Sequence, residues 1–133
     1  MKQILCVLIL CLAIIVSGCD KNKPILVLNS KPITAKTVNY PVQNFEVGQR
    51  INYALIMPKG FNDSAIRLQI IKKEEKAAYW GYKISQTYDR NVDTSKKFYI
   101  DYFTINKSGY YIIRAFEINN LDKQLAIMDF WVK

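Results

Sequence analysis

The chain has 133 residues, of which 50% are hydrophobic and 13% aromatic, so it carries too many core-forming side chains to be disordered. Nineteen Lys and Arg stand against eleven Asp and Glu, and this positive balance favours anionic surfaces as partners. No recognisable nucleic-acid motif is present, so nucleic acid is not expected as a partner. The chain has no histidine, which removes Ser–His–Asp and Cys–His catalysis and zinc sites that rely on histidine.

The N-terminal segment has the pattern of an export signal. One positive charge, Lys2, precedes an unbroken apolar run over residues 4–16, which is too short to span a bilayer because a spanning helix takes about 20 residues. Small residues follow this run, up to Cys19. The predicted organisation is a cleaved signal peptide over 1–18, a cysteine with a short tether over 19–24, and one domain over 25–133.

The segment Val16-Ser17-Gly18-Cys19 resembles the lipobox of bacterial lipoproteins, in which an aliphatic residue, a small residue and Gly or Ala precede a cysteine. The resemblance implies cleavage between Gly18 and Cys19, a diacylglycerol on the Cys19 thiol, and a fatty acyl group such as palmitate on its amino group. Two or three acyl chains anchor a protein firmly in a membrane, whereas a single acyl chain does so only marginally. An uncleaved anchor or an ordinary secreted protein is the alternative.

The position of the domain relative to the membrane follows from the residues after Cys19. Asp20 resembles the signal that retains lipoproteins of enteric Gram-negative bacteria in the inner membrane. Other lineages do not follow this rule, so an outer-membrane location is the alternative. A tether that ends at Pro24 reaches only about 15–17 Å, so we expect the basic domain to lie close to the bilayer, within reach of anionic headgroups.

The positions of the three cysteines exclude disulfide and thiol chemistry in the exported part of the chain. Cys6 and Cys11 lie in the apolar run and would leave with the signal peptide, and Cys19 would be consumed by lipid. We therefore expect no disulfide, no thiol nucleophile, no metal site, no cofactor and no catalytic residue.

Short alternating segments with turn signals between them predict an all-β domain. Seven or eight strands in about 110 residues indicate a small antiparallel β-sandwich. The predicted strands are 25–28, 33–39, 49–57, 64–72, 77–86, 97–105, 110–118 and 124–132, with turns at 58–63, 89–93, 107–109 and 119–123.

Period-2 alternation predicts which side chains face the core. The predicted inward sets are Ile51, Tyr53, Leu55 and Met57; Ile66, Leu68 and Ile70; Ala78, Trp80, Tyr82 and Ile84; Tyr111, Ile113 and Ala115; and Ala126, Met128, Phe130 and Val132.

The run from Gly109 to Ile113 resembles the entry to the penultimate strand of immunoglobulin-like domains. The resemblance implies a tyrosine corner at Tyr111, with Ile113 at the position where antibody domains have a cysteine. Trp80 would then be the core aromatic residue on an earlier strand. An architecture does not fix a function, so this resemblance predicts the fold alone.

The last two predicted strands are apolar on both sides, which is unusual for a solvated antiparallel sheet. We expect a partner-binding face here, unless the early segment 25–46 covers it or the register is shifted by one residue. Arg114 and Asp129 are expected to pair across the two strands. The predicted binding face comprises Tyr110, Ile112, Phe116, Ile127 and Trp131.

These features favour a lipid-anchored, non-catalytic module of the cell envelope that binds another envelope protein or contributes to an assembly. The alternative is a lipoprotein that binds a glycan or an anionic polymer through lysines and exposed aromatic residues, such as those in the dense segment 79–88. A more remote alternative is a hydrolase that uses strand carboxylates, for which Asp101, Glu117 and Asp129 would have to converge.

Overall fold

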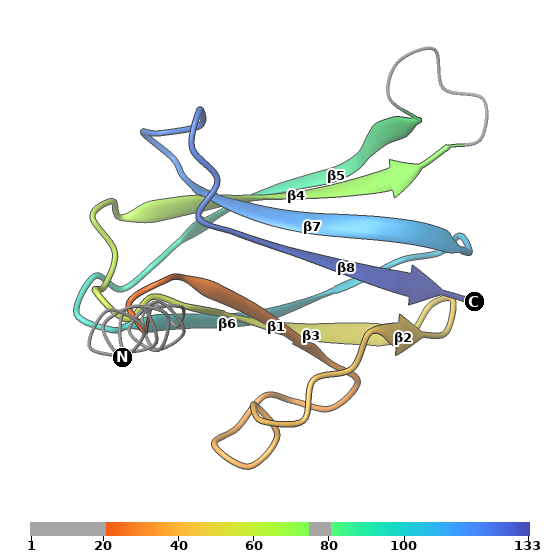
Figure 1. Ribbon diagram of the computed structural model, residues 1–133, viewed down its shortest axis with the longest axis horizontal. Coiled ribbons are helices and arrows are strands. Elements are labelled where there is room, and N and C mark those ends of the chain that lie inside the picture. Colours follow the sequence, from red (N-terminus) through yellow and green to blue (C-terminus); the bar gives the residue numbers. More distant parts are fainter. Residues whose placement is uncertain (1–20, 75–80) are drawn as a thin grey trace, which may run out of the picture.

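The computed structural model describes residues 21–74 and 81–133. The predictions for the signal peptide, Cys19, Asp20, Ala78, Trp80 and the start of the predicted strand 77–86 therefore lie outside the described residues. The described residues form eight strands in two facing sheets (Figure 1). The strands are β1 (Ile25–Asn29), β2 (Asn44–Phe45), β3 (Arg50–Ile56), β4 (Ala65–Lys73), β5 (Tyr82–Asn91), β6 (Phe98–Thr104), β7 (Gly109–Glu117) and β8 (Ala126–Val132).

The two sheets differ in size. The small sheet has the order β1-β3-β6 and the large sheet the order β2-β8-β7-β4-β5. All pairs are antiparallel except β2 with β8, a two-residue parallel pair that the alternation pattern is too short to predict. Among the described residues, no helix is long and apolar enough to cross a membrane. The predicted antiparallel β-sandwich is thus confirmed.

The core lies between the two sheets and is made by alternate residues of the long strands, as the period-2 pattern predicts. The predicted inward sets on β3, β4, β7 and β8 are buried or packed against the core. The largest fully buried side chains are Tyr111, Phe130, Leu26, Leu28, Ile51, Leu55, Ile66, Leu68, Ile70, Ile113 and Val132.

The tyrosine corner is present at the start of β7. Tyr111 is 1% exposed, and its hydroxyl donates to the backbone carbonyl of Lys107 at 2.8 Å. Its ring stacks on Phe130 with 5.5 Å between the centroids and 16° between the planes. Ile113 is fully buried two residues later. The sequence-based expectation for both residues is therefore confirmed.

The strand predicted over 33–39 is wrong, because local side chains close a turn there instead. Thr37 Oγ1 accepts the Thr34 N–H at 2.8 Å and donates to the Pro32 carbonyl at 2.9 Å. Such hydroxyl-to-backbone bonds compete with strand pairing. The loop then packs Ile33 and Val38 onto the outer side of the small sheet.

The fifth strand continues further along the chain than predicted. β5 covers Tyr82–Asn91 and runs through most of the predicted turn at 89–93, because Asp89 lies opposite Arg67 on β4. The two side chains form a bidentate ion pair, with Nε–Oδ1 at 2.7 Å and Nη2–Oδ2 at 2.9 Å. The chain turns only after Val92, where Asp93 accepts the Ser95 N–H.

Candidate functional site

The outer side of the large sheet carries an apolar surface that crosses four strands. The register aligns Ile84, Ile71 and Ile112 in one row across β5, β4 and β7. Beside it, Tyr110 lies opposite Trp131, and their rings are 4.9 Å apart between centroids. We call this surface the outer apolar face and define it as Ile71, Tyr82, Ile84, Tyr110, Ile112, Ile127 and Trp131.

A β-bulge in β5 extends this face beyond the last two strands. Ile70 pairs with Gln86 and Ile71 pairs with Ile84, so Ser85 is an extra residue without a counterpart on β4. A single extra residue exchanges the two faces of a strand from that point on. Ile84 is consequently 52% exposed and Tyr82 38% exposed. The prediction that both face the core is wrong, because alternation in the sequence does not reveal the bulge.

The predicted binding residues have separate outcomes. Ile127 and Trp131 are 52% and 49% exposed, and Tyr110 and Ile112 are half-buried. Phe116 is only 6% exposed, so its predicted place on an exposed face is wrong. It lines a pocket of about 320 Å³ together with residues of the loop between β7 and β8, which packs near the end of β7.

The predicted pair of Arg114 and Asp129 does not form, because the register places Asp129 opposite Ile112. Arg114 Nε donates to Gln69 Oε1 at 2.9 Å. Asp129 Oδ2 accepts the Tyr110 hydroxyl at 2.8 Å, and this hydrogen bond, together with partial desolvation, raises the pKa of Tyr110.

The early segment leaves the outer apolar face open. On the outer side it reaches only the edge of β8, where β2 pairs with the strand and Gln43 Nε2 donates to the Asp129 carbonyl at 3.2 Å. The loop after β1 instead covers the small sheet, on the opposite side of the sandwich (Figure 1). Among the described residues, the early segment therefore does not cover this face.

The three carboxylates considered for hydrolysis do not meet. Asp101 lies on β6 and pairs with Arg90 at 3.4 Å, whereas Asp129 lies on the outer side of β8. Glu117 is buried at the end of β7 and accepts the backbone N–H groups of Asn62 and Asp63 at 3.1 and 2.8 Å. Each carboxylate thus has a structural partner of its own, and the arrangement does not support a carboxylate-pair hydrolase.

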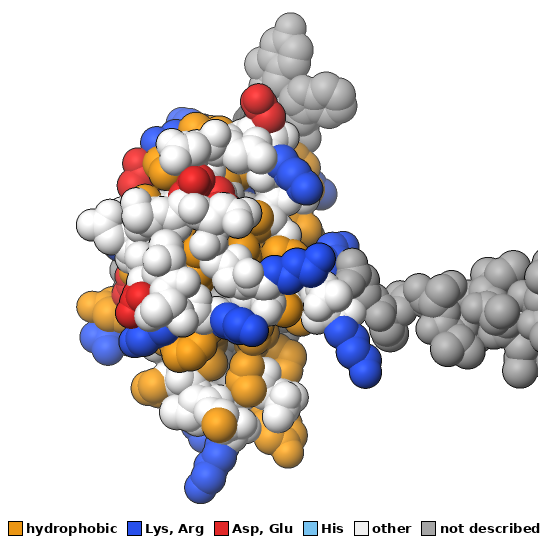
Figure 2. All heavy atoms as spheres, turned by 90° about the vertical axis from the view of Figure 1, so that its left-hand side faces the viewer, with side chains coloured by type: hydrophobic (Ala, Val, Ile, Leu, Met, Phe, Trp, Pro, Cys, Tyr) orange, Lys and Arg blue, Asp and Glu red, His pale blue; other side chains and the backbone are white. Residues whose placement is uncertain are grey.

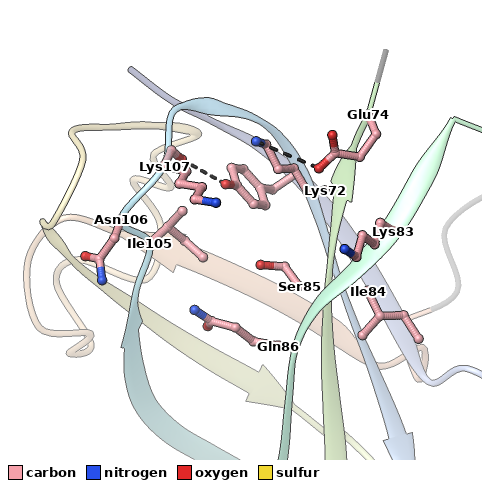
Figure 3. A pocket seen from close by; sticks show the side chains of 10 residues that line it. Lys72, Glu74, Lys83, Ile84, Ser85, Gln86, Ile105, Asn106 and Lys107 are labelled. Atoms are coloured by element: carbon pink, nitrogen blue, oxygen red, sulfur yellow. Dashed lines mark hydrogen bonds and ion pairs between the residues drawn. The ribbon is translucent and has the colours of Figure 1, made fainter. Parts of the chain in front are cut away.

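A second feature that alternation did not predict is a pocket of about 310 Å³ at the edge of the sandwich (Figure 3). We call it the basic pocket. One wall is the bulged part of β5, and the rim is the turn between β6 and β7. Its lining residues are Lys72, Glu74, Lys83, Ile84, Ser85, Gln86, Ile105, Asn106, Lys107 and Tyr111.

The β-bulge also places a lysine in this pocket. Lys72 lies opposite both Tyr111 and Lys83 in the register, so the three form a row on the inner side of the large sheet. Figure 3 shows the ends of Lys83 and Lys107 directed toward the space around Ser85, with Lys72 beside Glu74. Without the extra residue, Lys83 would lie on the outer side, as the alternation pattern suggests.

A second exposed apolar strip follows edge strand β6. Phe98, Ile100 and Tyr102 are exposed on its outer side, and the Arg50 guanidinium lies 3.9 Å from the Tyr102 ring centroid. Phe98 also borders a shallow, open apolar groove beside the loop after β1. The sequence signal for this strip was the presence of aromatic or aliphatic residues on both sides of the segment 98–104.

Comparison with known proteins supports the fold. No protein-family model matches the chain, and no curated protein matches it in sequence. It is similar to the soluble domain of PmoD from a Methylocystis species, with a TM-score of 0.53 and 13% identity over 86% of this chain and 94% of that one. It is also similar to an immunoglobulin-like protein from Pseudomonas aeruginosa, with a TM-score of 0.50 and 9% identity over 81% and 91%. The chain thus has an immunoglobulin-like β-sandwich fold.

Proposed function

We propose that the protein is a lipid-anchored, non-catalytic module of the bacterial cell envelope that binds another envelope protein through the outer apolar face. The observation that carries the proposal is the continuity of this face across β8, β7, β4 and β5. Exposed apolar patches of this kind on a soluble domain are typical of interaction sites. Aromatic anchors such as Trp131 and Tyr110 are the side chains that contribute most to binding energy.

The chemistry of the face defines the kind of partner that fits it. Its centre is aliphatic, from Ile71 and Ile112. Within residues 21–74 and 81–133, three charged side chains beside it form no ion pair: Lys73 opposite Tyr82, Arg114 opposite Ile127, and Asp129. Asp129 is already engaged by Tyr110 and Gln43. We therefore expect a folded partner with an apolar surface that carries a carboxylate opposite Lys73.

The positive charge at the end of the sandwich where β1 begins is compatible with an anchor at Cys19. The start of β1 lies at the same end as the loops after β3, β5 and β7, because Ile25 pairs with Ile56, which pairs with Phe98. Figure 2 looks onto this end and shows more Lys and Arg than Asp and Glu side chains. Its lysines include Lys21, Lys23, Lys59, Lys96, Lys97 and Lys123. In the proposed arrangement this end faces anionic headgroups.

Two substitutions on the face test the partner proposal. Trp131→Asp and Ile127→Asp place a charge on exposed positions and should abolish recovery of the partner from crosslinked envelopes. Ile100→Asp is the matched control, because Ile100 is a similarly exposed aliphatic residue on β6 of the small sheet. Identical neighbours from the wild type and from the Trp131 and Ile127 variants would contradict the proposal.

A further inference from the structure

We propose that the basic pocket binds the phosphate group of a small, soluble phosphate ester. The inference goes beyond the proposed function, because the pocket opens at the edge of the sandwich between β5 and the turn after β6. It shares with the outer apolar face only Ile84, at the edge of β5. The inference rests on the charge, the hydrogen-bonding groups, the size and the backbone geometry of the pocket.

The net positive charge of the side chains that line the basic pocket favours a ligand with two negative charges. The pocket is lined by three ammonium groups, on Lys72, Lys83 and Lys107, and by one carboxylate, on Glu74. The single ion pair among them, Lys72 Nζ to Glu74 Oε1, is long at 3.9 Å. Within the described residues, Lys83 and Lys107 form no ion pair, which leaves about two positive charges uncompensated. A phosphate monoester carries about this charge at neutral pH, whereas a carboxylate carries half of it.

Neutral polar groups complete the anion site. Gln86 is held in place because its Nε2 donates to the Thr104 carbonyl at 3.2 Å and its Oε1 accepts the Tyr88 hydroxyl. The side chains of Ser85 and Asn106 have no hydrogen-bond partner within residues 21–74 and 81–133. Their hydroxyl and amide groups are therefore available to donate to phosphate oxygens.

The size and floor of the pocket favour an ester over free phosphate. A volume of about 310 Å³ lies at the lower end of the range of about 300–1,000 Å³ for small-molecule sites. Ile105 and Tyr111 form a buried, apolar floor. Burial and the neighbouring Glu74 raise the pKa of Tyr111, so its phenol stays protonated and bonded to Lys107. Lysines around a partly apolar floor suit a phosphate that carries a small organic group.

Two backbone irregularities, the bulge at Ser85 and the positive φ of Gly109, lie beside the lysines of this pocket. The bulge at Ser85 turns Lys83 inward, and bulges often re-aim side chains beside functional sites. Gly109, with φ of 152°, lies beneath Lys72, where an added Cβ would come within 2.9 Å of Lys72 Cε. This value of φ is one that L side chains rarely adopt, so the backbone conformation favours glycine at this position.

The location of the pocket favours a soluble ester over a lipid headgroup. Residues 105–107 follow the end of β6, whereas the start of β1 aligns with Phe98 at the beginning of that strand. Since a strand rises about 3.3 Å per residue, β6 separates the two ends by about 20 Å. A headgroup beneath the N-terminal end would thus lie away from the pocket.

The test uses the full chain in non-ionic detergent at low ionic strength, titrated calorimetrically with glycerol 3-phosphate, inorganic phosphate, acetate and glycerol. We expect saturable binding of glycerol 3-phosphate, weaker binding of inorganic phosphate, and none of acetate or glycerol. Lys83→Ala should weaken binding of the ester about tenfold or more. Lys73→Ala is the matched control, since it removes the same charge from the outer side of β4, and should change the affinity less than about twofold.

Three results would overturn the proposal: no saturable binding of the ester, equal binding of acetate, or equal losses in the Lys83 and Lys73 variants with unchanged thermal unfolding. Vesicles with and without phosphatidylglycerol separate the two sources of phosphate. Binding to phosphatidylglycerol vesicles that Lys83→Ala abolishes, without binding of the free ester, would assign the site to a headgroup and overturn the soluble source. Trp131→Asp should leave ester binding intact, so the two proposals can fail separately.

Discussion

The tyrosine corner offers a quantitative prediction about stability. Tyr111→Phe removes one hydrogen bond, 2.8 Å long, and keeps the ring that stacks on Phe130. Lys107 is exposed, so its released carbonyl can bond to water and leaves no buried unsatisfied group. The net loss should therefore be that of a single hydrogen bond, about 0.5–1.5 kcal/mol. Tyr111→Ala also removes a ring that is 1% exposed and should cost about 3–5 kcal/mol.

Urea unfolding of the full chain, followed by far-ultraviolet circular dichroism, measures both changes. The midpoint should fall while the m-value stays constant, because the surface exposed on unfolding is unchanged. Tyr110→Phe is the control: its hydroxyl binds Asp129 on the solvent-facing side of the sheet, so its loss should lie within about 0.5 kcal/mol of zero. Equal stabilities of the Tyr111→Phe and Tyr110→Phe variants would refute the structural role assigned to the corner.

Three further predictions concern other groups. Glu117→Ala should destabilise the fold by about 2–4 kcal/mol, because the buried carboxylate accepts the N–H groups of Asn62 and Asp63, and Glu117→Gln should cost less in the same urea assay. Burial and the Asp101 carboxylate raise the pKa of Tyr99 from 10.0 to about 12, so the unfolded chain loses this proton first. Stability that is present below pH 10 should therefore decline between pH 10 and 12, and less steeply in Tyr99→Phe. Cys19→Ala should move the protein from the membrane to the soluble fraction and abolish labelling with radioactive palmitate; unchanged partitioning would contradict the anchor.

The sequence predicted best what depends on local pattern alone. Strict alternation in β3, β4 and β8 placed their inward residues correctly, because a strand buried on one side must repeat every two residues. The spacing from Gly109 to Ile113 located the tyrosine corner because its hydrogen bond is local, from Tyr111 to a carbonyl four residues earlier. These features need no knowledge of the partner strand.

Features set by pairing between distant segments could not be predicted in this way. The extra residue Ser85 is visible only once β5 is paired with β4, and it decides the faces of both Lys83 and Ile84. The burial of Phe116 depends likewise on where the loop after β7 packs. The basic pocket and the breadth of the outer apolar face both follow from the bulge, so both were missed for the same reason.

The most direct test of the proposed function is site-specific photo-crosslinking in living cells. A benzophenone amino acid at position 127 probes the outer apolar face, and the same group at position 102 probes the apolar strip on β6. We predict a discrete crosslinked envelope protein from position 127, lost when Trp131→Asp is added, and no such product from position 102. A product from position 102 alone, or none from position 127, would contradict the assignment of the binding surface to the large sheet.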